Sequence, residues 1–228
     1  MSQKKIIVAL DSDNLNNTVS LVKNLKKDIY AFKIGYEFFL NFGISGYRSI
    51  QQENVKIFFD LKLHDIPNTV KSGIDAITKL NPCFTTIHLS GGDEMQKAAV
   101  SVKKNTKIVG VSILTSLDSS QTKKYHYNDN LEKIVADYTH YALINNLDGV
   151  VCSPKEIEII KKIAADKLII ITPGIRPSGS LSVQDDQKRF MTPKEAIKCG
   201  ANYLVIGRPI TQSSKPLETV QKINSTLE

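Results

Sequence analysis

Short hydrophobic runs recur along the whole chain and alternate with longer segments in which hydrophobic and polar residues are mixed. Most of these runs are almost continuously apolar, which is typical of strands that are covered on both faces of a parallel sheet. The pattern predicts eight strands: Ile6–Leu10, Ala31–Ile34, Val55–Asp60, Phe84–Leu89, Lys107–Leu114, Gly149–Cys152, Lys167–Thr172 and Tyr203–Gly207.

The segments between these runs have the spacing of amphipathic helices. In Leu15–Leu25, apolar residues recur every three or four positions. Ser153 and Pro154 precede a second segment with this spacing; serine is suited to the N-cap position and proline to the first helical turn. Thr192-Pro193-Lys194-Glu195 places a glutamate three residues after a threonine, which predicts a capping box.

The order of these elements predicts the fold. Eight strand–helix units follow one another without a linker-like stretch, whereas an open doubly wound sheet has about five or six strands. We therefore expect an α/β fold, a single (β/α)8 TIM barrel that forms one domain over residues 1–228. Two long irregular segments, Ser116–Asn130 and Arg176–Phe190, each follow a strand, so we expect the active site at the C-terminal ends of the strands.

Composition narrows the class of protein further. The chain has 228 residues, and its apolar runs are too short for a membrane span or a signal peptide. Its three cysteines are scattered and form no C-x-x-C motif, which favours a reducing compartment, so we expect a cytoplasmic protein. The formal charge is +7, but the lysines are dispersed and aromatic residues are few, so a nucleic-acid partner is not expected.

Charged residues close several of the predicted strands, and the third strand is the most informative. Strand side chains alternate, so Asp60 and Lys62 of Phe58-Phe59-Asp60-Leu61-Lys62 should share the inward face. Charges there are costly unless they are paired or functional. The pair is either a buried ion pair or part of a catalytic centre, in which the lysine forms a Schiff base or donates a proton.

The residues that follow Lys62 are ambiguous on their own. Asp65 could cap the helix that begins near Ile66-Pro67, or it could belong to the site. His64 would face away from Lys62 if the strand continued, and we expect a structural role for it.

Two glycine–arginine segments predict a phosphate site. Gly174-Ile175-Arg176 follows the seventh strand, and Gly207-Arg208 follows the eighth. Those loops frequently bind phosphate in this barrel, through backbone N–H groups and charge-assisted hydrogen bonds. The chain contains no Walker A or G-x-G-x-x-G motif, so a P-loop or dinucleotide enzyme is not expected.

Several longer segments resemble the orotidine 5′-phosphate decarboxylase family, specifically its bacterial branch. The matches span nearly the whole chain, and the segment that begins at Asp60 is the most specific of them. They are Val8-Ala9-Leu10-Asp11, Phe32-Lys33-Ile34-Gly35, Asp60-Leu61-Lys62-Leu63-His64-Asp65-Ile66-Pro67-Asn68-Thr69, His88-Leu89-Ser90-Gly91-Gly92, Leu114-Thr115-Ser116, Val151-Cys152-Ser153-Pro154, Thr172-Pro173-Gly174-Ile175-Arg176-Pro177 and Val205-Ile206-Gly207-Arg208-Pro209-Ile210-Thr211.

The resemblance implies an activity: decarboxylation of orotidine 5′-monophosphate to UMP in pyrimidine biosynthesis, without a metal or organic cofactor. It implies that Lys62 is the proton donor and acts with Lys33, Asp60 and Asp65. An ammonium beside the reacting carbon fits this chemistry, because it stabilises the carbanion and then delivers the proton.

The resemblance also implies substrate contacts and a partner. The implied substrate-binding residues are Asp11, Lys33, Thr69, Thr115, Arg176, Gln187, Gly207 and Arg208. In the family, the residues that match Asp65 and Thr69 reach into the active site of a second subunit, so a homodimer is expected. The segment between Arg176 and Asp186-Gln187 is about two residues longer than is usual in the family, so Gln187 is the least closely matched of these residues.

Two other functions share some of these features. Magnesium-dependent sugar-phosphate decarboxylases and aldolases of the same superfamily share the D-x-K-x-x-D segment, but they carry an acidic metal ligand near the second strand, where this chain has Lys33. A basic RNA-binding module would explain the net charge, but it would not explain Asp60 and Lys62 on an inward face.

Overall fold

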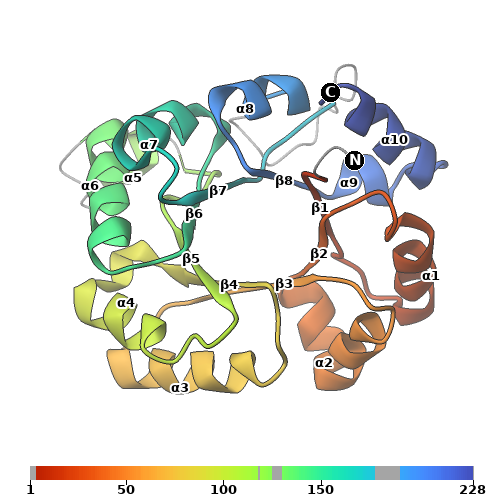
Figure 1. Cartoon of the computed structure of the whole chain (residues 1–228), viewed down its shortest axis with the longest axis horizontal. Coiled ribbons are helices and arrows are strands. Elements are labelled where there is room, and N and C mark those ends of the chain that lie inside the picture. The colour runs from red at the N-terminus through yellow and green to blue at the C-terminus, as the bar shows by residue number, and fades with distance from the viewer. Residues whose placement is uncertain (1–3, 118, 125–129, 178–190, 228) are drawn as a thin grey trace.

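The computed structural model describes residues 4–117, 119–124, 130–177 and 191–227. Its strands form a closed parallel barrel in chain order, in which β8 pairs with β1 (Figure 1). They are β1 (Ile6–Ala9), β2 (Ala31–Ile34), β3 (Ile57–Leu63), β4 (Phe84–His88), β5 (Lys107–Val111), β6 (Gly149–Val151), β7 (Ile169–Thr172) and β8 (Tyr203–Ile206). The predicted (β/α)8 TIM barrel is confirmed.

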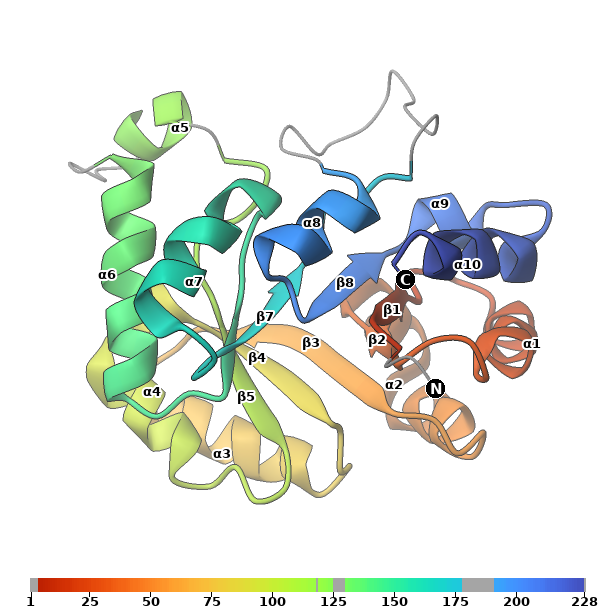
Figure 2. The ribbon, with the colours of Figure 1, turned by 45° about the horizontal axis from the view of Figure 1, so that its top comes forward.

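The helices form an outer ring around the strands, as both ribbon views show (Figures 1 and 2). They are α1 (Leu15–Leu25), α2 (Tyr36–Gln51), α3 (Pro67–Thr78), α4 (Asp93–Val100), α5 (Ser119–Lys124), α6 (Leu131–Ile144), α7 (Ile157–Ala164), α8 (Pro193–Cys199), α9 (Arg208–Thr211) and α10 (Pro216–Ser225), with 3-10 turns at Leu89–Gly91 and Pro154–Glu156. Helix α5 corrects the expectation that Ser116–Asn130 is irregular throughout. Its sequence is almost entirely polar, so it has no apolar stripe to find.

Two helix starts follow the local rules that the sequence indicates. Thr192 and Glu195 form the predicted capping box at α8. Ser153 and Glu156 form a second capping box, but it closes a 3-10 turn that precedes α7 and not the α-helix itself. These caps depend on residues within one turn of each other, which is why the sequence indicates them.

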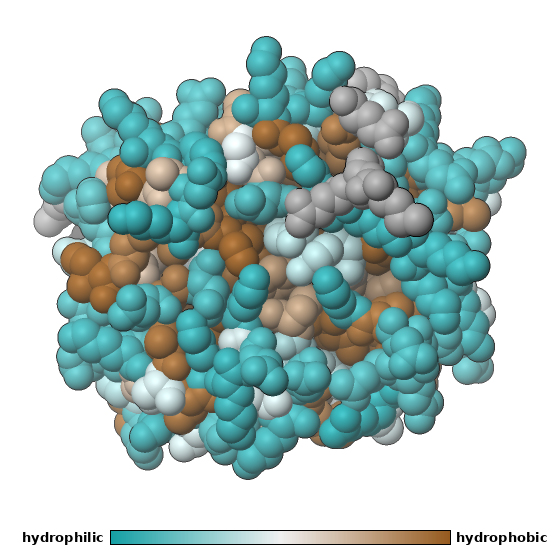
Figure 3. Space-filling model, viewed as in Figure 1, coloured by the Kyte–Doolittle hydropathy of each residue, from teal (hydrophilic) through white to brown (hydrophobic). Residues whose placement is uncertain are grey.

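The hydrophobic core has two layers, because strand side chains alternate between the inside of the barrel and the helices. Ile7, Phe58, Phe84 and Ile171 belong to the interior cluster. The larger cluster lies between strands and helices and includes Phe59. Hydrophilic side chains cover most of the rim of the face in Figure 3, while hydrophobic side chains show between them nearer the middle.

Strand β3 differs most from its prediction. It begins at Ile57 and continues to Leu63, whereas the apolar run predicted Val55–Asp60. Its pairing with β4 also shifts: Phe59 pairs with Thr85, but the next pair joins Leu63 to Ile87. Four residues of β3 thus advance opposite two of β4, so the segment between Phe59 and Leu63 bulges out of the ladder.

No helix in the described residues is long and apolar enough to cross a membrane.

Candidate active site

Strand β3 places two charged side chains at the mouth of the barrel. Phe58 lies in the interior cluster, and alternation directs Asp60 to the same side. The backbone of Lys62 has a φ of 46°, in the left-handed region that residues other than glycine seldom adopt. Such a conformation is costly and tends to occur at functional sites. Both side chains line the same pocket, as strand alternation predicts, while Leu61 and Leu63 pack against the outer cluster.

Four charged groups form a chain of ion pairs at this point. The Lys62 Nζ atom donates to both Asp60 carboxylate oxygens, at 2.9 Å each. The Lys33 Nζ atom lies 3.5 Å from Asp60 Oδ2 and 3.4 Å from Asp11 Oδ1. Positive and negative groups therefore alternate from Lys62 through Asp60 and Lys33 to Asp11, which lies at the end of β1.

Neighbouring charges favour the ionised forms of Asp60 and Lys33. Burial alone would raise the pKa of Asp60, but the ammonium groups of Lys33 and Lys62 outweigh it, with hydrogen bonds from Lys62 and Thr86, and hold that pKa below its usual value. Burial alone would lower the pKa of Lys33, but the carboxylates of Asp60 and Asp11 outweigh it and raise that pKa. The site therefore holds a carboxylate between two lysines in a largely buried position.

Thr86, on β4, was not singled out by the sequence analysis. Its side chain is fully buried, its Oγ1 atom accepts a hydrogen bond from the Lys62 backbone N–H at 2.8 Å, and its hydroxyl donates to Asp60 Oδ1 at 3.0 Å. The available signal was a pair of threonines, Thr85 and Thr86, in the strand that leads to His88. That signal says nothing about which residues the hydroxyl meets.

The ion-pair chain lies in a pocket of about 310 Å³ at the barrel mouth. The pocket brings together eight of the predicted site residues, drawn from several strand ends. They are Asp11, Lys33, Asp60, Lys62, Thr115, Arg176, Gly207 and Arg208. Gly174, with a φ of 78°, also lines it and allows the turn after β7 that precedes Arg176. The pocket thus combines the ion-pair chain with both predicted glycine–arginine segments.

Two further predicted site residues lie elsewhere. Asp65 and Thr69 are exposed and do not line this pocket of their own chain. Asp65 does not cap α3, because Ile66 is the N-cap residue; the Asp65 carboxylate instead accepts a hydrogen bond from the Ile66 backbone N–H at 2.6 Å. Gln187 lies outside the described residues.

The histidines near the site pair with each other. The ring centroids of His64 and His88 lie 5.2 Å apart. Burial, with smaller contributions from His64 and Lys62, lowers the pKa of His88, so this side chain is neutral near pH 7. Neither histidine lines the pocket.

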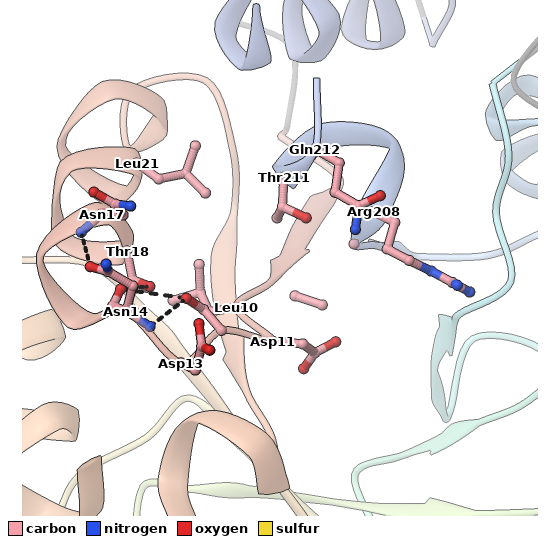
Figure 4. A pocket seen from close by; sticks show the side chains of 13 residues that line it. Leu10, Asp11, Asp13, Asn14, Asn17, Thr18, Leu21, Arg208, Thr211 and Gln212 are labelled. Carbon is pink, nitrogen blue, oxygen red and sulfur yellow. Dashed lines mark hydrogen bonds between the residues drawn. The ribbon is translucent and has the colours of Figure 1, made fainter. Parts of the chain in front are cut away.

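A second pocket, of about 380 Å³, adjoins the first and shares Asp11, Gly207 and Arg208 with it. Figure 4 shows that Asn17 and Leu21 line it from α1, whereas Asp11 and Arg208 extend away from that helix. Arg208 therefore borders both pockets.

Comparisons with known proteins agree with this geometry. The model of a family described as "Orotidine 5'-phosphate decarboxylase / HUMPS family" matches residues 4–223. A relative from Ehrlichia chaffeensis named orotidine 5'-phosphate decarboxylase is 44% identical over 98% of this chain and 96% of its own length. A relative of the same name from Vibrio cholerae is 38% identical over the whole of both chains.

A solved structure supports the same conclusion. The crystal structure of orotidine 5'-phosphate decarboxylase from Lactobacillus acidophilus superposes with a TM-score of 0.85. It is 33% identical, and the match covers 99% of this chain and 100% of that one. The chain belongs to the orotidine 5'-phosphate decarboxylase / HUMPS family.

Proposed function

We propose that this protein decarboxylates orotidine 5′-monophosphate to UMP, with Lys62 as the proton donor and without a metal or organic cofactor. One observation carries the proposal: the Lys62 ammonium lies 2.9 Å from both oxygens of a buried carboxylate, in the pocket that also contains Arg176 and Arg208. An ammonium held there can meet a carbanion, and the arginines can bind a phosphate.

In the proposed reaction, the bond between C6 of the pyrimidine and its carboxylate carbon breaks, and carbon dioxide leaves. The bonding electrons stay on C6, where the Lys62 ammonium stabilises the developing charge. A proton then passes from Lys62 Nζ to C6, which leaves UMP and a neutral amine. Asp60 holds the Lys62 ammonium in place for that step through hydrogen bonds to both of its carboxylate oxygens.

The residues that line the pocket support a set of proposed substrate contacts. Asp11 and Lys33 sit at the ends of neighbouring strands and can bind the ribose hydroxyls. Thr115 is proposed to contact the pyrimidine, and Arg176 and Arg208 to bind the phosphate; all three line the pocket. Phosphate binding far from the reacting carbon supplies energy for closing the site over the substrate, and Gln187 is proposed to join in that closure.

We also propose a homodimer in which Asp65 and Thr69 complete the pocket of the partner subunit. Both residues are exposed and lie outside their own chain's pocket. Large apolar side chains are exposed on the segments before and after β3: Leu40 on α2 is 80% exposed, and Ile66, which follows Asp65, is 67% exposed. Large apolar side chains left open in this way favour a surface that another chain covers.

The second candidate function is a magnesium-dependent reaction on a sugar phosphate, because the family's name also includes the HUMPS branch. In that branch an acidic residue near the second strand binds the metal. Here that position holds Lys33, whose ammonium lies 3.4 Å from Asp11 and 3.5 Å from Asp60. A cation already occupies the space between these carboxylates, which favours the orotidylate reaction.

The test is decarboxylation of orotidine 5′-monophosphate, followed by ultraviolet absorbance with and without EDTA. We expect activity that EDTA does not change and that falls by about 100-fold or more in Lys62→Ala, the range for loss of a general acid. Lys162→Ala, an exposed lysine on α7 outside the pocket, is the matched control and should keep full activity. Folded protein that releases no carbon dioxide would refute the proposed function.

A further inference from the structure

Thr86 joins the two residues on which the proposed chemistry depends. Its single oxygen accepts from the Lys62 backbone N–H and donates to the Asp60 carboxylate. We propose that Thr86 is a positioning residue, which holds the Lys62 ammonium and the Asp60 carboxylate in their reactive arrangement. This inference rests on the proposed function and goes beyond it, since it assigns a role to a residue that does not meet the substrate.

The bulge in β3 creates the need for such a residue. Between Phe59 and Leu63, β3 leaves its regular ladder with β4, so the Lys62 N–H loses the carbonyl that a regular strand would offer. A buried N–H without an acceptor is costly. The Thr86 side chain supplies that acceptor from the neighbouring strand, at 2.8 Å.

The left-handed backbone of Lys62 makes the same point independently. A φ of 46° is unfavourable for a lysine and persists only where surrounding contacts impose it. This conformation sends the Nζ atom back to Asp60, two residues earlier on the same strand. Thr86 contacts both residues of this ion pair: it accepts a hydrogen bond from the strained backbone of Lys62 and donates one to the Asp60 carboxylate.

The direction of the second hydrogen bond follows from the first. Because Thr86 Oγ1 already accepts from the Lys62 N–H, its own proton is free to point at the ionised Asp60 carboxylate. A hydrogen bond to a charged acceptor is among the stronger ones in proteins. The hydroxyl thereby fixes one carboxylate oxygen and leaves both available to the Lys62 ammonium.

Thr86 acts through these residues and not on the ligand. It is fully buried and does not line either of the pockets that meet at Arg208. Removal of its hydroxyl should therefore lower the rate of the chemical step and leave ligand binding nearly unchanged.

The chain offers a matched control in the adjacent residue. Thr85 is also fully buried, and its hydroxyl donates to the backbone carbonyl of Phe59 on β3 at 2.9 Å. Replacing either threonine with valine removes one buried hydroxyl between the same two strands. Only the Thr86 hydroxyl contacts Lys62 and Asp60.

The experiment compares Thr86→Val, Thr86→Ser and Thr85→Val in the full-length protein. We expect kcat for decarboxylation to fall about 10- to 100-fold in Thr86→Val, the range for losing a hydrogen bond to a charged group, with KM changed less than about threefold. Thr86→Ser should recover most of the rate, because it keeps the hydroxyl. Thr85→Val should lower the free energy of unfolding in urea about as much as Thr86→Val does, but it should retain the wild-type kcat.

Two results would overturn the proposal. In the first, Thr86→Val has the same kcat as Thr85→Val. In the second, Thr86→Ser is as slow as Thr86→Val. If valine prevents folding, Thr86→Ala removes the hydroxyl without adding branched bulk and takes its place. A crystal structure of the variant gives a readout that does not depend on activity. In that structure we expect the backbone of Lys62 to leave the left-handed region. If Lys62 and Asp60 keep their conformations, the positioning role is refuted, even if the wild type proves inactive on orotidine 5′-monophosphate.

Discussion

Mixing two inactive variants tests whether active sites are shared between subunits. Lys62→Ala removes the proposed proton donor from a chain's own pocket, whereas Asp65→Asn removes a carboxylate that we assign to the partner's pocket. A dimer containing one chain of each kind has one site in which both residues are wild type. Its other site lacks both, so activity should return when the two variants exchange subunits.

The size of the recovery follows from the geometry of a two-fold dimer. Random exchange of equal amounts gives mixed dimers for about half of the molecules, and each mixed dimer has one complete site of two, so about a quarter of wild-type activity should return. Each variant alone should retain about 1% or less, as expected for loss of a catalytic group. The recovered signal therefore stands well above either background.

The assay is decarboxylation of orotidine 5′-monophosphate after mixing, with two affinity tags to confirm that mixed dimers have formed. The control pairs Lys62→Ala with Asp60→Asn. Those two residues meet at 2.9 Å within one chain, so both belong to the same pocket and no mixed dimer can contain a complete site. We expect no recovery in this control.

Mixed dimers of Lys62→Ala and Asp65→Asn that stay inactive would refute the shared site. Equal recovery in the control pair would refute it as well, because activity would then return without a complete pocket. A monomeric wild-type protein with full activity would contradict the homodimer itself.

Two further predictions concern single charges. Asp60→Asn should lower the free energy of unfolding near pH 7 by about 3 kcal/mol, because two largely buried ammonium groups lose their shared carboxylate. The folded-state pKa of Asp60 is lowered, so this stability is present above about pH 4 and is lost as the pH falls through that lowered value. Urea unfolding at pH 7 and at pH 3 should therefore show a smaller stability difference between wild type and Asp60→Asn at the lower pH. A stability difference that grows toward acid would contradict an ionised Asp60. Arg208→Ala should raise KM for orotidine 5′-monophosphate about 10- to 100-fold through loss of a charge-assisted phosphate contact, with Arg208→Lys intermediate. Steady-state kinetics check this, and an unchanged KM would remove Arg208 from the phosphate site.

Local and repeating features were predictable from the sequence. The eight apolar runs correspond to the eight strands because strands buried on both faces leave a continuous hydrophobic signature. The capping box of Thr192 and Glu195 was predictable because its partners lie three residues apart. The meeting of Asp11, Lys33 and Asp60 in one pocket was predictable because parallel strands of a barrel end at one mouth.

Other features depend on contacts between distant segments. The bulge of β3 arises from its register with β4, and no pattern within Asp60-Leu61-Lys62 indicates a left-handed lysine. Asp65 is adjacent in sequence to the charged segment, yet it lies outside its own chain's pocket. Closeness in sequence cannot show which of these charged side chains enter the pocket, because the direction of a side chain after a strand depends on the backbone turn that follows.

The sequence alone therefore determined the barrel, the strand ends that carry charge and the identity of the charged groups, since these depend on periodicity and short-range chemistry. Only the tertiary structure decided how the groups act on one another. It brought Lys33 and Lys62 to the same carboxylate, and it placed Thr86 between the backbone of Lys62 and Asp60. Those contacts join β2, β3 and β4, and their geometry depends on how neighbouring strands pair.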